Sequence, residues 1–209
     1  MCNDLKGLRP VSLRFVAGAH TDRGYCMAEQ RHTHHMLRIN RAPVLTLWAA
    51  VVAERLGFTW EEALTLGRAV AGLNAYAKGK ALGVFTPTPP AIQAQRRAQR
   101  QQETLMVSLL HRAVPTMYTA SGLRALSKDK PIDPGSVQRY LESKFGAALE
   151  DAYEAMRKLA TSRPPAVLED EAYQLYEQFR PAIPAGTKGW GAAGTLNLDA
   201  MQKLAADSL

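Results

Sequence analysis

The densest group of basic side chains in this sequence lies on one predicted helix. Arg96, Arg97 and Arg100 are interleaved with glutamines, and Arg96 and Arg100 share a face because they are one helical turn apart. Arginine binds phosphate oxygens in bidentate geometry, and glutamine hydrogen-bonds the edge of adenine in the major groove. The pattern predicts a DNA-binding helix whose arginines hold phosphates, with Gln95 and Gln99 as candidate base contacts.

Two further groups of basic residues are candidates for phosphate contacts. Arg124, Lys128 and Lys130, in a predicted loop, could extend the surface of this helix, and Arg68, Lys78 and Lys80, on an earlier helix, would form a second patch. Several phosphate contacts of this kind would make binding fall steeply with salt. A solvated helix face that binds nothing has the same composition, and the sequence leaves this alternative open.

Three histidines, His32, His34 and His35, lie close together ahead of the first predicted helix. Neighbouring histidines bind zinc or copper when a third and a fourth ligand converge on the ion. Their spacing matches no closed metal site, and a polar approach to the helix explains them more simply. We therefore predict no cofactor, and a metal-dependent enzyme is the third hypothesis for function.

The loop from Gly189 to Gly194 matches the pattern G-x-G-x-x-G. A proline-rich turn precedes it and little chain follows, whereas a dinucleotide site requires a preceding strand and a full βαβ unit. Trp190 either fills the core between glycines that allow close backbone approach, or forms with Lys188 an exposed tip that reaches a groove or a partner. The chain contains no G-x-S-x-G, H-E-x-x-H or P-loop motif, so we predict no catalysis.

Two consecutive helical patterns are predicted to form the scaffold that positions the candidate binding residues. The first, Val44 to Leu56 with Pro43 in its first turn, is apolar almost all round and belongs at the centre of a core. The second runs from Trp60 to about Lys80, and Thr59 and Glu62 form a capping box at its start. Its core-facing stripe is predicted to comprise Leu66, Val70, Leu73 and Ala77.

The connection between these two helices has the spacing of a helix-turn-helix. Ala53 would let the second helix pack closely, and Gly57 would supply the positive φ that the sharp turn needs. Such a module commonly reads DNA, and its groove-facing positions here would be Glu61, Glu62, Thr65 and Arg68. Two glutamates at the front of a recognition helix repel phosphates, so the alternative is that the pair is a scaffold for the basic helix.

The remainder of the chain predicts further helices separated by breakers. Thr86–Pro90 is a proline-rich linker, and a third helix follows from about Ala91 to His111, polar in its first half and amphipathic in its second. Arg112–Thr119 is β-prone, but Pro115 restricts it to an edge strand or an extended segment. A short strand is predicted at Val11–Gly18, and helices at 134–145, about 147–160, about 166–179 and in a final segment capped by Asn197.

These elements predict a mainly α protein, a multi-helix domain with a helix-turn-helix-like hairpin and at most a small β ribbon. The predicted regions are an N-terminal extension (1–40), a helical hairpin core (41–85), a proline-rich linker (86–90) and a helical domain with a C-terminal glycine-rich loop and short helix (91–209). The length of 209 residues and the hydrophobic fraction of 46% suffice for a real core. Two cysteines, no signal-peptide pattern and no run long enough to span a bilayer predict a cytoplasmic protein without a membrane partner.

Three runs of the sequence resemble a bacterial protein family. They are INRAPVLTLWAAVVAERLGF, GLRALSKDKPIDPGSVQRYLESKFG and LYEQFRPAIPAGTKGWGAAGTLNLD, and the resemblance covers residues 35 to 205. It implies a self-contained bacterial domain. The family brings no assigned activity and no catalytic residues, so the function has to be argued from the residues themselves.

The net charge of +7 is unevenly distributed, with the basic excess before residue 131 and acidic helices after it. This polarity favours a polyanionic partner, and a DNA-binding protein of regulatory or architectural type is the leading hypothesis. The alternative is a protein-interaction module in which the basic face of one copy pairs with the acidic helices of another, forming a homo-oligomer.

Overall fold

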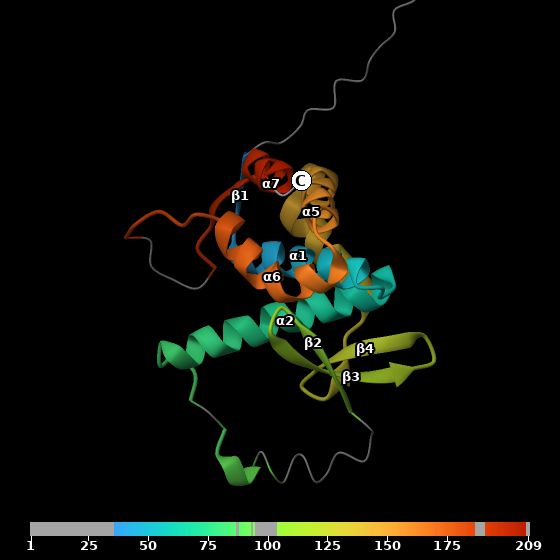
Figure 1. Cartoon of the computed structure of the whole chain (residues 1–209). Helices are drawn as coiled ribbons and strands as arrows, with labels where there is room; N and C mark the ends of the chain where they lie inside the picture. The colour runs from blue at the N-terminus through green and yellow to red at the C-terminus, as the bar shows by residue number, and fades with distance from the viewer. Residues whose placement is uncertain (1–35, 87, 93, 95–103, 187–190, 208–209) are drawn as a thin grey trace, which may run out of the picture. The chain divides into compact units, whose positions relative to one another are not determined.

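The computed structural model describes residues 36–86, 88–92, 94, 104–186 and 191–207, all within one compact unit, Thr33–Leu209 (Figure 1). In this part of the chain the fold is mixed α/β, with six α-helices and two antiparallel sheets of two and four strands. The prediction of a mainly α domain with at most a small ribbon is therefore wrong. The hairpin predicted at 41–85 and the described parts of 91–209 contribute to the same hydrophobic core.

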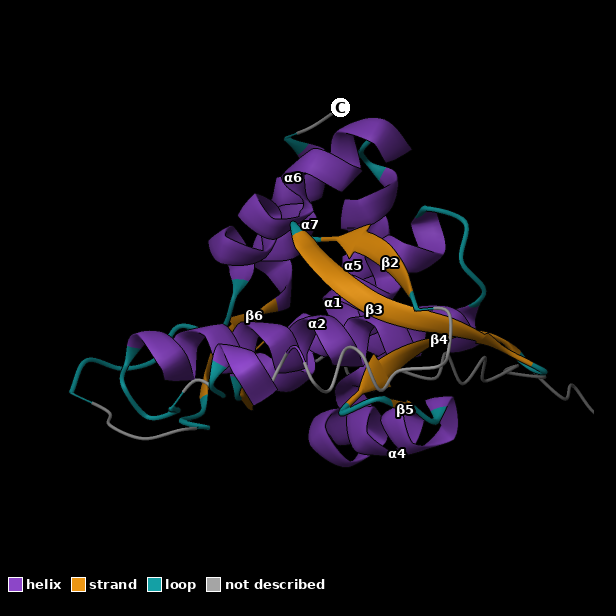
Figure 2. Cartoon of the chain, turned by 90° about the horizontal axis from the view of Figure 1, so that it is seen from below, coloured by secondary structure: helices purple, strands orange, loops and turns teal. Residues whose placement is uncertain are grey.

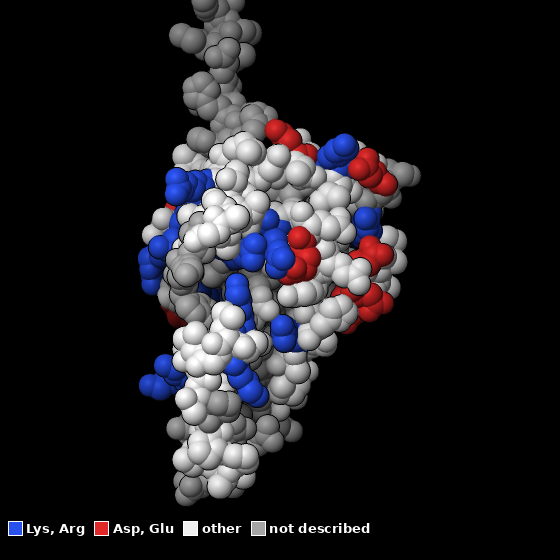
Figure 3. Space-filling model, turned by 90° about the vertical axis from the view of Figure 1, so that its left-hand side faces the viewer, with Lys and Arg blue, Asp and Glu red and all other residues white. Residues whose placement is uncertain are grey.

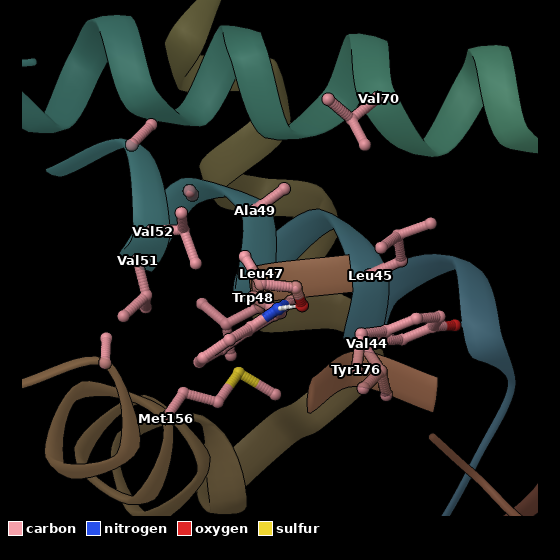
Figure 4. Packing of buried hydrophobic residues seen from close by; sticks show 14 of the residues in the cluster. Val44, Leu45, Leu47, Trp48, Ala49, Val51, Val52, Val70, Met156 and Tyr176 are labelled. Atoms are coloured by element: carbon pink, nitrogen blue, oxygen red, sulfur yellow. Dashed lines mark hydrogen bonds between the residues drawn. The ribbon is translucent and has the colours of Figure 1, made fainter. Parts of the chain in front are cut away.

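Helix α1 (Arg41–Arg55) forms the centre of that core, as its apolar sequence predicts. Every residue from Pro43 to Ala53 is buried. The indole N–H of Trp48 donates to the Ala172 carbonyl at 2.8 Å, and the ring packs edge-on against Phe179. Figure 4 shows Trp48 between α1 and Met156, while Val70 of the next helix points toward α1 from the other side. A helix covered on all sides needs no polar face, which explains its composition.

Helix α2 (Trp60–Ala81) packs along α1. Gly57 has the predicted positive φ, 105°, and Thr59 and Glu62 form the predicted capping box. Close contact depends on Gly67, because a Cβ there would collide with the Thr46 carbonyl and lie 2.9 Å from the Ala50 nitrogen. The two backbones approach so closely only because this position carries no side chain.

A four-stranded antiparallel sheet lies across α2 (Figure 2), in the order β2-β3-β4-β5. Its strands are β2 (Leu105–Leu109), β3 (Arg112–Thr119), β4 (Gly122–Ser127) and β5 (Lys130–Pro131). The two-residue turns β2–β3 (Leu110, His111) and β4–β5 (Lys128, Asp129) have positive φ at both residues, the conformation that short hairpins favour.

Strand β2 overturns the predicted helix from Ala91 to His111 over its second half. A short apolar run such as Leu105–Leu109 fits a helix or a strand equally well, and pairing with β3 decides between them. The edge-strand prediction for Arg112–Thr119 is also wrong, because β3 lies inside the sheet. Pro115 pairs with Met106 and lies one residue outside the β3–β4 ladder, so β4 requires no hydrogen bond from its nitrogen.

The second sheet joins segments from the two ends of the described chain. Strand β1 (Met36–Ile39) pairs with β6 (Gly194–Asn197), and neither strand was predicted. Gly194 also lets the segment around Ala182 approach β6, because a Cβ on Gly194 would lie 2.6 Å from the Ala182 carbonyl oxygen, and Ala182 forms a bridge with Thr195. Helix α7 (Leu198–Ala206) follows directly, and the Asn197 side chain accepts from the Ala200 N–H as predicted.

The remaining helices match the sequence predictions to within about two residues. They are α4 (Pro134–Phe145), α5 (Leu149–Thr161), preceded by a 3₁₀ turn at Gly146–Ala148, and α6 (Pro165–Phe179). Asp133 caps α4 by accepting from the Ser136 N–H at 2.8 Å. Within the described ranges, none of the helices combines the length and the apolar character that crossing a membrane requires.

Candidate nucleic-acid interface

The first turns of α2, predicted to face a DNA groove, instead hold strand β4. Glu62 Oε1 accepts from the Leu123 N–H at 2.9 Å, and Thr65 Oγ1 accepts from the Ala125 N–H at 3.1 Å. Glu61 pairs with Arg124 at 2.6 Å. Because the sheet contacts these side chains, α2 does not present them together to the major groove. The two helices are joined by a turn with positive φ at Gly57, as predicted, and the first turns of the second helix are engaged inside the fold.

The contact with β4 changes the pKa of the Glu62 carboxyl. The Leu123 N–H donates to it and is the main reason why the pKa of Glu62 is lowered, with partial burial opposing the shift. The Thr59 N–H also donates, to Oε2 at 3.0 Å. One ionised side chain therefore caps α2 and anchors β4.

Arg124 was predicted to hold phosphate, but it is a buried residue of β4. Its side chain is 6% exposed, and its guanidinium donates to Glu61 and to the Leu123 carbonyl. A guanidinium in this position is neutralised within the chain, so we remove Arg124 from the candidate surface. The sequence could not reveal this, because Glu61 lies 63 residues away from Arg124.

The other predicted basic residues in the described part of the chain are exposed. Lys128 and Lys130 flank Asp129 at the β4–β5 turn. The Arg68 guanidinium lies 4.5 Å from the centroid of the Tyr140 ring on α4, a cation–π contact that leaves the residue exposed. Lys78 and Lys80 are exposed in the last turn of α2.

The last turns of α2 and the residues after them form a surface of which the sequence analysis predicted the two lysines but missed the apolar part. We call it the α2 tip and define it as Tyr76, Lys78, Lys80, Leu82, Val84 and Phe85, all of which are exposed. The buried stripe of α2 weakens here, since Leu66 and Val70 are buried but Leu73 and Ala77 only partly so. In Figure 1 this end of α2 extends beyond the neighbouring helices.

The α2 tip is held in a defined conformation. Gly83, at φ 69°, reverses the chain, and the Val84 and Phe85 N–H groups both donate to the Gly79 carbonyl, at 2.9 and 3.3 Å. The reversal brings the Phe85 ring against Tyr76, with centroids 6.0 Å apart and planes 13° apart. The signal in the sequence is that Tyr76 and Phe85 fall outside the predicted core stripe while lysines follow Tyr76 closely.

The charged side chains of the segment that contains the α2 tip are all basic. No Asp or Glu occurs between Glu62 and Glu103, and this acid-free segment carries Arg68, Lys78, Lys80, Arg96, Arg97 and Arg100. Figure 3 shows one face of the molecule on which Lys and Arg spread over the middle and the left, while most Asp and Glu gather toward the right and the top. Such separation produces a positive local potential that attracts polyanions.

Several predicted site residues lie outside the described residues. They are Arg96, Arg97, Arg100, Gln95 and Gln99 of the basic segment, the histidines His32, His34 and His35, the strand Val11–Gly18, and Lys188 and Trp190 of the glycine-rich loop. In the described part, no group of three or more His, Cys, Asp or Glu side chains is placed to hold a metal ion. Of the glycines in this loop, Gly194 has a close backbone neighbour, the Ala182 carbonyl.

Comparisons of the chain with protein-family models, with curated proteins and with solved structures gave no match. The resemblance of the three sequence runs to a bacterial family therefore remains a prediction. The function has to be argued from the charge and the shape of the surface.

Proposed function

We propose that the protein is a cytoplasmic DNA-binding protein of regulatory or architectural type that holds phosphates and catalyses no reaction. The observation that supports this most strongly is the acid-free segment between Glu62 and Glu103, whose described lysines, Lys78 and Lys80, are exposed. Affinity for nucleic acid arises mainly from cations that displace the counterions of phosphates. A segment with cations and no carboxylates avoids the like-charge repulsion that would weaken such contacts.

Binding through phosphates fits this protein better than reading of bases by α2. Its Glu62 and Thr65 side chains are engaged by β4, so the start of the helix has no free polar groups at those positions for a base edge. Phosphate contacts fix the position of a protein on DNA without specifying sequence. Gln95 and Gln99 stay the candidates for any base contact, and Arg68, Lys128 and Lys130 are additional cations.

Removal of the cations should weaken DNA binding and flatten its salt dependence. We expect a labelled random-sequence duplex to bind at about 50 mM salt and to bind far more weakly at about 200 mM, measured by fluorescence anisotropy. The variant Arg96→Ala, Arg97→Ala, Arg100→Ala should lose about tenfold in affinity, and its log–log salt slope should fall by about 2 to 3 units. Lys78→Ala, Lys80→Ala should lower the slope by about 2.

A matched control separates phosphate binding from general charge. Lys144 and Lys158 are exposed lysines in the last turns of α4 and α5, as Lys78 and Lys80 are in α2. The variant Lys144→Ala, Lys158→Ala removes the same charge from equivalent helix positions and should bind DNA like the wild type. Absence of binding even at the lower salt concentration would rule out the proposed function.

Self-association is the second candidate function, and strand β2 favours it. Among the described residues β2 pairs with a strand on one side only, and its sequence LMVSL contains no charge and no proline. Leu105 is 39% and Met106 60% exposed. Unprotected edges of this kind pair with another chain, so two copies could continue one sheet across both molecules.

Met106→Lys should shift such a dimer toward monomer, because a lysine on an edge strand opposes pairing. Sedimentation equilibrium at low and high salt is the measurement. A dimer built on β2 should persist at high salt, whereas one built on the contrast of basic and acidic faces should dissociate. A wild-type chain that is monomeric at every concentration tested would exclude this candidate.

A further inference from the structure

The exposed aromatic residues of the α2 tip have no explanation in the core. Tyr76 is 45% and Phe85 41% exposed, and Leu82 and Val84 beside them are more exposed still, at 62% and 55%. The chain folds back so that the Phe85 ring lies against Tyr76, and Leu82 and Val84 are exposed in the same short reversal. Contiguous exposed apolar surface of this kind marks a place where something binds.

The charged side chains near this surface indicate which class of ligand binds there. Lys80 lies four residues after Tyr76 and therefore on the same face of α2, one turn further on. Lys78 is two residues from each of them and faces the other side of the helix. No carboxylate is present in this segment of the chain. An aromatic ring beside a lysine on one face is an arrangement by which proteins bind unpaired bases, with a base stacked on the ring and the cation on a phosphate.

We propose that the α2 tip binds single-stranded DNA, with a base stacked on Tyr76 and the adjoining phosphate held by Lys80. This inference rests on the proposed function and names its substrate class. A duplex keeps the faces of its bases stacked against one another, whereas a single strand offers them to a protein ring. The protein should therefore bind a single strand more tightly than a duplex of equal length.

Contact with Phe85 orients the Tyr76 ring, which we call the stacking platform. The rings are 13° from parallel, so a base stacked on Tyr76 continues an existing stack. The hydrogen bonds from Val84 and Phe85 to the Gly79 carbonyl hold the reversal of the chain in place before any ligand arrives. A platform organised in advance loses less conformational freedom on binding.

The test compares an oligothymidine with a duplex of the same length by fluorescence anisotropy on the full chain. We expect Tyr76→Leu, which keeps apolar contact with Phe85 but removes the aromatic face, to lose about tenfold in affinity for the single strand. Its affinity for the duplex should change little. Tyr76→Phe keeps the ring and should bind both ligands like the wild type.

Two further variants test whether the effect is specific to a base stacked at position 76. Tyr118 on β3 is 71% exposed and distant in sequence from the α2 tip, so Tyr118→Leu should leave the preference for the single strand unchanged. In Tyr76→Trp, the added indole fluorescence should be quenched by oligothymidine and not by duplex, because only a stacked base reaches the ring. Thermal unfolding of each variant verifies that the fold is intact.

The outcomes separate this inference from the proposed function. Equal affinity for single strand and duplex, unchanged in Tyr76→Leu, would overturn the stacking platform and leave a phosphate-binding protein. Absence of binding to either ligand at low salt would overturn the proposed function itself. Quenching of the Tyr76→Trp signal by duplex as strongly as by the single strand would also overturn the platform.

Discussion

Replacing Gly67 with alanine should lower the free energy of unfolding by about 2 to 3 kcal/mol. The added Cβ would collide with the Thr46 carbonyl oxygen and would lie 2.9 Å from the Ala50 nitrogen and 3.2 Å from its Cβ. Two of these three atoms belong to the backbone of α1, the most buried helix of the fold, so they cannot rotate away. Relief requires α1 and α2 to separate, which opens gaps along their whole contact.

Gly72 provides the matched control for this prediction. It lies in the same helix, but a Cβ on Gly72 would meet no atom within 4 Å. Gly72→Ala should therefore stabilise the protein by up to about 1 kcal/mol, the gain in helix propensity from glycine to alanine. Urea unfolding followed by circular dichroism measures both variants. If Gly67→Ala were as stable as Gly72→Ala, the close contact between the two helices would be wrong.

Replacing Glu62 with alanine should cost about 2 to 3 kcal/mol, although the residue lies near the surface. Its two carboxylate oxygens accept from the Leu123 and Thr59 N–H groups, so the change removes the Glu62 half of the capping box of α2 and the anchor of β4 together. The Leu123 amide loses its partner at a buried residue, and its hydrogen exchange should accelerate. Glu169→Ala, at an exposed carboxylate of α6, should have little effect.

The stabilisation by Glu62 should depend on pH in a direction set by its lowered pKa. A carboxyl whose pKa is lower in the folded than in the unfolded chain binds fewer protons when folded, so it stabilises the fold at higher pH. The difference in stability between wild type and Glu62→Gln should be full above about pH 5 and should shrink as the pH falls through the folded pKa. A difference that stays constant down to low pH would contradict the ionic anchor.

Local signals in the sequence predicted most helices correctly. The Thr59–Glu62 capping box, the Asp133 and Asn197 caps and the positive φ of Gly57 all act within a few residues of the element that they begin or end. Capping and apolar periodicity depend on nearby atoms, so they can be recognised before any tertiary contact is known. The prediction of α1 at the centre of the core is confirmed for the same reason.

The sheets escaped prediction because their stability comes from partners that are distant or ambiguous. Met36 pairs with Asn197, at the other end of the described chain. Neither β1 nor β6 has a sequence pattern that predicts a strand without knowledge of its partner. The apolar run Leu105–Leu109 fits the periodicity of a helix and of a strand equally well, and only its ladder with β3 makes it a strand. A strand becomes stable by hydrogen bonding to another strand, so its own residues specify it only in part.

The sequence by itself determined the positions of α1, α2 and α4–α7, the caps at Thr59, Asp133 and Asn197, and the concentration of cations in a segment without carboxylates. Tertiary structure alone decided which of the predicted site residues meet solvent. It placed Arg124 in the interior beside Glu61, and through the turn at Gly83 it stacked Phe85 on Tyr76. The physical reason is that a side chain's exposure and partners depend on the packing of elements far apart in sequence, whereas its charge and its local helical position do not.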